Sequence, residues 1–139
     1  ANKYKCNVLQ HPGGNLYNAS SDVNSFHYAE QLSSARICVT CSGMPKSRFG
    51  KYIEIPMCGT ALAADMPDEQ QDQFKDFMIE ISMSMSDVEI INKLSYYLDN
   101  EEELQKITKK GLEYAENHTQ EKYAESFVNI AKEFLEETQ

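Results

Sequence analysis

The chain has 139 residues, with 13 basic and 22 acidic side chains and a formal net charge of −9. A domain takes about 100–200 residues, so this length fits one domain or part of one. Apolar runs are short, as in residues 37–39, and the first 30 residues are polar. We therefore expect no transmembrane segment, no secretory signal, no binding to nucleic acid and a cytoplasmic location.

The charge is unevenly distributed along the chain. Residues 1–60 carry six basic and three acidic side chains, whereas residues 61–100 carry two and nine, and residues 101–139 carry five and ten. A bulk polyanion would be repelled, but a small phosphate-bearing ligand would find local positive charge in the first half. Solvated C-terminal helices that simply carry the acids are the alternative explanation.

Four segments have the composition of strands. They are residues 4–10, which give only a weak signal, and residues 37–41, 60–64 and 77–82. The last three are short and continuously apolar, a pattern typical of parallel strands buried on both faces.

The segments between and after these strands have apolar residues at helical spacing. This spacing predicts helices at residues 25–33, 47–57 and 86–98, a helix or loop at 69–77, and two further helices after residues 100 and 119. Pro56 and Gly59 should end the second helix. Ser86 with Glu89, and Asn100 with Glu103, are spaced as N-terminal capping pairs. The last helix has an apolar stripe, which we expect to pack against the sheet or its neighbours.

Strands that alternate with helices predict an α/β fold: three layers around a mostly parallel sheet, with a helical C-terminal end. Ligands of such sheets bind beyond the carboxyl ends of the strands. The loops at residues 11–14, 42–48 and 65–68 are therefore the places to look for a site.

The cysteines do not predict a metal or redox centre. Cys38 and Cys41 have C-x-x-C spacing, but they lie within a predicted strand, where positions three apart face opposite sides. No second cysteine pair completes a metal site, and the three histidines are scattered along the sequence. We expect structural, reduced thiols and no bound metal.

Residues 42–60 form the most informative segment. The segment begins where a strand ends and contains three cations, Lys46, Arg48 and Lys51. A helix starting there would favour an anion at its free N–H groups. Glu54 is the one carboxylate within the segment. It could accept two hydroxyls of a ribose, or it could form an ion pair with Lys51 or Arg48, and the spacing does not decide between them.

The motif from Lys51 to Thr60, Lys-Tyr-Ile-Glu-Ile-Pro-Met-Cys-Gly-Thr, follows a strand and a serine-containing loop and precedes an apolar strand. This order resembles the donor-binding, C-terminal half of GT-B glycosyltransferases of group 1, most of all the CgeB-type branch. The closing portion is similar as well: residues 90–98, then 101–104, Gly111 and His118-Thr119. The resemblance covers residues 8 to 135.

The resemblance implies a Rossmann-like domain that binds a nucleotide sugar. Glu54 matches the glutamate that holds the ribose hydroxyls of the donor. Gly59 and Thr60 match the turn beside the nucleotide. Ser42, Gly43 and the segment from Arg48 to Lys51 would lie near the sugar or the diphosphate. Such enzymes need no metal and no other cofactor, because basic side chains neutralise the departing diphosphate.

The sequence departs from the family in two respects. Lys46 stands eight residues before Glu54, where retaining members often have a second glutamate. In addition, a complete enzyme needs an N-terminal acceptor domain. We therefore expect residues 1–139 to form a single small or partial domain, the C-terminal part of a longer glycosyltransferase that transfers sugar to an unknown acceptor, and to be inactive alone.

Two other interpretations remain open. The chain could be a non-catalytic interaction module that keeps the fold. It could also be an unrelated flavodoxin-like or response-regulator-like α/β domain, although the residues after the first predicted strand suit neither class, and G-x-G-x-x-G is absent.

Overall fold

The computed structural model describes residues 3–9 and 21–137 of the chain. Its centre is a sheet of three parallel strands in the order β1 (Ile37–Val39), β2 (Ala61–Ala64) and β3 (Ile79–Glu80). In the register of the sheet, Cys38 lies opposite Leu62, and Ala63 lies opposite Ile79. The predicted α/β class with a parallel sheet is confirmed.

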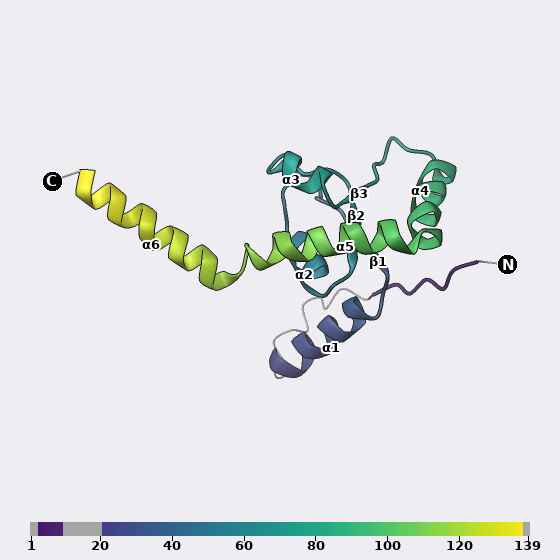
Figure 1. Ribbon diagram of the computed structural model, residues 1–139, viewed down its shortest axis with the longest axis horizontal. Coiled ribbons are helices and arrows are strands. Elements are labelled where there is room, and N and C mark those ends of the chain that lie inside the picture. Colours follow the sequence, from purple (N-terminus) through teal and green to yellow (C-terminus); the bar gives the residue numbers. More distant parts are fainter. Residues whose placement is uncertain (1–2, 10–20, 138–139) are drawn as a thin grey trace.

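Within the described residues, six helices accompany the sheet, as Figure 1 shows. They are α1 (Ser21–Ser33), α2 (Lys51–Met57), α3 (Gln71–Lys75), α4 (Asp87–Asp99), α5 (Glu101–Glu116) and α6 (Gln120–Glu137). Strands and helices alternate from α1 to α4, which gives a Rossmann-like layout.

The sheet is covered on both faces, as continuous apolar strands require. On one face, Leu62 and Ala64 of β2 belong to a core cluster with side chains of α1, α2, α5 and the α3 region. On the other face, Ala61 and Ala63 pack with Ile79 and with Leu104 of α5, and α4 adds Leu94 and Tyr97. The strand β2 lies between the two clusters and is completely buried.

Gly111 marks a close approach between α5 and the segments that it packs against. A Cβ atom at this position would lie 3.1 Å from Cδ2 of Phe77 and 3.3 Å from Cβ of Pro56. The absence of a side chain therefore sets how near α5 lies to α2 and to the residues before β3.

The prediction of a strand at residues 4–10 is wrong. None of residues 3–9 belongs to the sheet, and residue 10 lies outside the described residues. Instead, the start of the segment is bound to the end of α4, where Lys3 Nζ and Tyr4 Oη both donate hydrogen bonds to the Asp99 carboxylate. Val8 is 90% exposed, so the segment has no buried face that would support strand pairing.

Helix α2 begins at Lys51, four residues later than predicted. Residues 43–46 form a turn instead, in which Gly43 and Lys46 both have positive φ angles, +68° and +47°. Residues 47–49, which follow this turn, are not helical either: the Arg48 amide donates to Glu69 Oε2, and the first helical hydrogen bonds go to the carbonyls of Phe49 and Gly50. Its end agrees with the prediction: Pro56 lies in the last turn and Gly59 follows with φ +69°.

Of the two predicted capping pairs, one is confirmed. The hydroxyl of Ser86 accepts from the amide of Glu89, and the carboxylate of Glu89 accepts from the amide of Ser86. Asn100 does not cap α5. Its side-chain amide donates to the Tyr96 carbonyl at 2.6 Å and so serves the end of α4.

The prediction that the last helix packs against the body is also wrong. Helix α6 extends away from the sheet and the other helices (Figure 1), and all its described side chains are exposed. Tyr123, Phe127 and Ile130 of the apolar stripe are 65–75% exposed. Both faces of the sheet are already covered by α1 to α5, so the described body leaves this helix no core to join. None of the described helices is long and apolar enough to cross a bilayer.

Candidate functional site

The loops that follow β1 and β2 meet at the carboxyl edge of the sheet, where parallel α/β proteins bind their ligands. Ser42 follows β1 and Asp65 follows β2. The backbone amide of Ser42 donates to Asp65 Oδ1 at 2.7 Å, and its hydroxyl donates to Asp65 Oδ2. Tyr52 of α2 completes the arrangement, because its hydroxyl donates to the Asp65 carbonyl oxygen at 2.7 Å.

These contacts fix the protonation state of Asp65. Burial opposes ionisation, but the hydrogen bonds from Ser42 and Tyr52 outweigh it and lower the pKa of the carboxyl group. Burial, and the negative charge of Asp65, raise the pKa of Tyr52 in return. Ser42 is fully buried and already bound to Asp65. Ser42 therefore shapes the loop after β1, and its hydroxyl already has a hydrogen-bond partner within the protein, Asp65.

A second network joins the β1–α2 loop to the end of α5. Arg48 Nη1 donates to the hydroxyl of Tyr114 at 3.0 Å, and this hydroxyl donates to Gln70 Oε1 at 2.6 Å. His118 Nδ1 lies 2.7 Å from the Tyr114 carbonyl oxygen, which can only accept, so Nδ1 carries a proton. The backbone amide of Arg48 is held as well, by Glu69 Oε2 at 2.9 Å.

The three cations of the segment have no ion-pair partner in the part of the chain that the structure describes. Within residues 3–9 and 21–137, the salt bridges involve other basic groups, and none involves Lys46, Arg48 or Lys51. By contrast, Arg36, at the other edge of the sheet, is paired with Glu101. The carboxyl edge therefore holds three cations without a direct ion pair in the described residues, and the carboxylates of Asp65, Asp68 and Glu69 lie in the neighbouring loop.

The expected anion site at the N-terminus of α2 is not supported by the helix itself. Helix α2 has seven residues, and the amides of Tyr52 and Ile53 in its first turn already donate to the carbonyls of Phe49 and Gly50. Arg48 precedes the helix instead of starting it. The positive charge of this segment therefore comes from its side chains.

Glu54 lies on the flank of α2 that faces α1. The hydroxyl of Tyr28 donates to Glu54 Oε2 at 3.3 Å, and the carboxylate is otherwise exposed. Burial and the nearby Glu54 carboxylate raise the pKa of Tyr28 to about 12. Among the described residues Glu54 forms no ion pair, so neither of the pairings considered for it, with Lys51 or with Arg48, is present.

The remaining predicted site residues do not gather at one place. Gly43 lies in the turn after Ser42, where its positive φ of +68° and a Phe49 ring carbon 3.0 Å from the position of a Cβ atom both require glycine. Gly59 and Thr60 precede β2 and so lie at the opposite edge of the sheet from Ser42. The Thr60 hydroxyl is buried and donates to the carbonyl of Leu32 at 2.8 Å.

Sequence reasoning did not single out Asp65, Gln70 or Tyr114. Asp65 lies at the start of the loop expected to contribute to the site, and a carboxylate directly after a buried strand was a usable signal. Tyr114 and Gln70 gave no such signal, because Arg48 lies 66 residues before Tyr114 and the partner of a distant side chain is not encoded in local spacing. The loop at residues 11–14 lies outside the described residues.

Two open cavities lie away from the carboxyl edge. One, of about 350 Å³, is lined by residues of the opposite edge, such as Arg36 and Gly59, and by α5. The other, of about 290 Å³, lies between the α3 region and α5. The described part of the chain contains no group of three or more His, Cys, Asp or Glu side chains that could hold a metal ion.

Comparison with known proteins supports the glycosyltransferase part of the resemblance seen in the sequence. No curated protein and no solved structure matches the chain. A family model described as "Glycosyl transferase-like" matches residues 8–129, which include the whole sheet, helices α1 to α5 and the loops of the candidate site. Since this match covers most of the sequence, the chain belongs to the glycosyl transferase-like family.

Proposed function

We propose that the chain is the donor-binding, C-terminal part of a nucleotide-sugar-dependent glycosyltransferase of GT-B type, close to the CgeB-type branch. Family membership supports glycosyl transfer in general. The observation that carries the finer proposal is a group of cations beside the carboxyl edge of the sheet, Lys46, Arg48 and Lys51, which form no ion pair with any described residue. A diphosphate is the ligand group that such a cluster favours.

In this proposal Arg48 and Lys51 lie near the diphosphate and Glu54 holds the ribose hydroxyls. Glu54 suits this role because its residue is exposed and, among the described side chains, its carboxylate accepts one long hydrogen bond, from Tyr28. Ser42 and Gly43 shape the loop after β1 on the sugar side. Gly59 and Thr60 would act from the far end of α2, by fixing how this helix is joined to β2.

The acceptor is expected to bind to a separate N-terminal domain. Transfer requires donor and acceptor to be held together, so the chain alone should be inactive. The exposed stripe of α6, with Tyr123, Phe127 and Ile130, offers a surface for such a domain. We further propose a cytoplasmic location, where the four free cysteines would stay reduced.

Ligand-observed NMR with UDP, GDP, ADP, CMP and their sugar conjugates tests this function. We expect selective binding of one nucleotide class, weakened about tenfold or more by Glu54→Gln, since a hydrogen bond to a charged group is lost. Glu113→Gln, at an exposed position of α5, is the matched control. Equal binding by the Glu54→Gln variant would exclude the ribose role.

The second candidate is a non-catalytic interaction module. Lys46, in place of the second glutamate of retaining enzymes, and the exposed stripe of α6 favour it. Binding of no nucleotide at millimolar concentration, by this chain and by the chain joined to its acceptor domain, would support this candidate. The family match argues against an unrelated flavodoxin-like domain.

A further inference from the structure

Tyr114 is buried in the middle of an aromatic cluster, yet its hydroxyl reaches the candidate site. Its ring packs against Phe74, Phe77 and His118, with centroid distances of 5.2, 5.0 and 4.1 Å. These contacts fix the direction of the side chain, so the position of the hydroxyl is set by the core of the domain. Burial, opposed in part by the Arg48 charge, raises the pKa of Tyr114 and keeps the hydroxyl protonated.

The hydrogen bonds around this hydroxyl have a single consistent direction. The proton of Tyr114 goes to Gln70 Oε1 at 2.6 Å, which leaves the lone pairs of the oxygen for Arg48 Nη1 at 3.0 Å. The side-chain nitrogen of Gln70 then points to His118 Nε2 at 3.5 Å. In the neutral tautomer that carries its proton on Nδ1, as the contact with the Tyr114 carbonyl requires, His118 Nε2 is the acceptor for this amide.

Arg48 is therefore held without being neutralised. The side-chain partner of this guanidinium is a neutral phenol oxygen, and it forms no ion pair within the described residues. Among these residues one Nη1 donor is used, the other guanidinium donors stay available, and Glu69 is bound to the backbone amide of Arg48 instead of to its side chain. This arrangement suits a guanidinium that must bind an anion in a defined orientation.

We propose that Tyr114 is a positioning residue: its hydroxyl, fixed by Gln70, orients the Arg48 guanidinium toward the diphosphate of the ligand. Tyr114 itself does not contact the ligand. This inference rests on the proposed function, since it takes the ligand of Arg48 to be a diphosphate. It also explains why the end of α5 and the loop after β1 are joined by side chains 66 residues apart.

A double-mutant cycle tests the inference. Tyr114→Phe keeps the ring and removes only the hydroxyl, whereas Arg48→Ala removes the group that it holds. With UDP and GDP as probes, we expect Tyr114→Phe to weaken binding about fivefold to tenfold, the effect of one hydrogen bond. In the Arg48→Ala background the same change should have no further effect. Tyr123→Phe, on the exposed α6, is the matched control and should bind as the unchanged chain does.

A second measurement needs no ligand and separates the two ideas. In ¹⁵N spectra of the full chain, Tyr114→Phe should shift the Arg48 side-chain signal and speed its exchange with water, and Tyr123→Phe should not. If the Arg48 signal changes but no nucleoside diphosphate binds to the unchanged chain, alone or joined to its acceptor domain, the proposed function fails while the positioning of Arg48 stands. An unchanged signal, or an equal loss of affinity in both backgrounds, would overturn the role of Tyr114 even if the nucleotide binds.

Discussion

Asp65 accepts hydrogen bonds from both the backbone amide and the hydroxyl of Ser42, and so joins the end of β2 to the end of β1. We expect Asp65→Asn to lower the free energy of unfolding at neutral pH by about 1–3 kcal/mol, because hydrogen bonds to a charged group are weakened. The folded-state pKa of Asp65 is lowered, so its contribution is present at neutral pH and is lost as the pH falls through that pKa. Denaturant unfolding should therefore show a difference in the free energy of unfolding between the unchanged protein and Asp65→Asn that disappears in acid. Asp68→Asn, at an exposed position, is the control. A difference for Asp65→Asn that stays constant with pH would contradict this explanation.

The buried hydroxyl of Thr60 ties the end of α1 to the start of β2. It donates to the carbonyls of Leu32 at 2.8 Å and of Ala35 at 3.3 Å. Thr60→Val should destabilise the fold by about 1–3 kcal/mol, since it removes a buried donor that serves both carbonyls and leaves that of Leu32 with the Ala35 amide alone. Thr60→Ser keeps the hydroxyl and should cost only about 1 kcal/mol for the lost methyl group. Calorimetric unfolding of both variants shows which one is destabilised more. A larger decrease in the free energy of unfolding for Thr60→Ser than for Thr60→Val would show that packing, and not the hydrogen bond, dominates at this position.

Replacing either of two glycines with alanine should lower the free energy of unfolding, for a different physical reason in each case. Gly111→Ala places a Cβ atom 3.1 Å from the Phe77 ring and should cost about 1–3 kcal/mol by overpacking. Gly59→Ala meets open space, but its φ of +69° is strained for alanine and should cost about 1–2 kcal/mol. Asn tolerates this conformation better, so Gly59→Asn should recover part of the loss, whereas Gly111→Asn should be worse than Gly111→Ala. Thermal unfolding of the four variants distinguishes strain from crowding.

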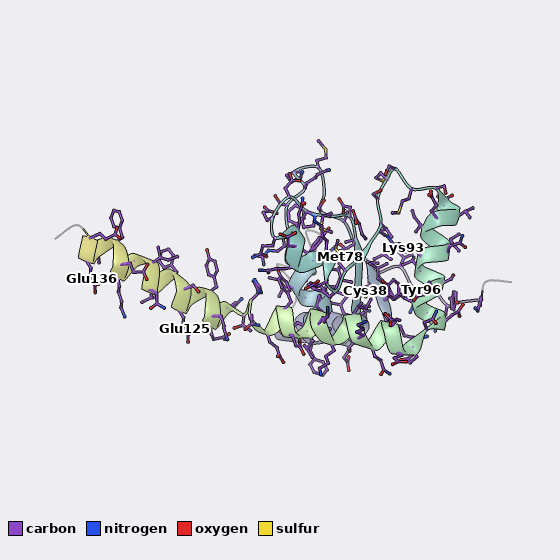
Figure 2. The ribbon with its side chains drawn as sticks, turned by 45° about the horizontal axis from the view of Figure 1, so that its top comes forward. Cys38, Met78, Lys93, Tyr96, Glu125 and Glu136 are labelled. Atoms are coloured by element: carbon purple, nitrogen blue, oxygen red, sulfur yellow. The ribbon has the colours of Figure 1, made fainter. Side chains whose placement is uncertain are left out.

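Helix α6 should contribute little to the stability of the body. Phe127 is 65% exposed, so Phe127→Ser should leave the main unfolding transition within about 0.5 kcal/mol of its original free energy. Leu104→Ala, at a position 4% exposed, should cost about 2–5 kcal/mol in the same assay. Figure 2 shows that Glu125 and Glu136 also lie on this projecting helix, far from the labelled residues of the body. A large decrease in the free energy of unfolding for Phe127→Ser would mean that the apolar stripe of α6 is covered in solution.

The cysteines should differ in their reactivity toward an alkylating reagent. Burial, followed by the proximity of Cys58, raises the pKa of Cys38, and burial and the Glu54 carboxylate raise that of Cys58. Cys6 and Cys41 are exposed, so they should be modified first near neutral pH, while the other two react only as the pH rises. Mass spectrometry of timed digests checks the order. Glu54→Gln should speed the modification of Cys58, and an unchanged rate would remove the electrostatic part of this explanation.

Much of the fold could be predicted because it rests on local patterns. The continuous apolar run at β2 indicates a buried parallel strand, and the structure buries all of it. The spacing of Ser86 and Glu89 predicts where α4 begins, since both capping partners lie within one turn. Such features need no knowledge of distant residues.

The errors arise where local patterns give way to backbone strain or to long-range packing. Periodicity placed the start of α2 too early, because the hydrogen bond that holds the Arg48 amide to Glu69, 21 residues away, is not visible in local spacing. The apolar stripe of α6 predicts a buried face, but whether a core is available depends on the rest of the fold. The contact from Arg48 to Tyr114 could not be inferred at all, since both residues have ordinary local roles in a loop and in a helix.

The close approach at Gly111 has a consequence for how related sequences can vary. Its missing side chain, the Phe77 ring and Pro56 occupy one shared volume. A relative with alanine or serine at the position of Gly111 should therefore carry a smaller side chain at that of Phe77, or lack the proline. These three positions should thus change together during evolution, although they are far apart in the sequence, and an alignment of the family would reveal them as a coupled group.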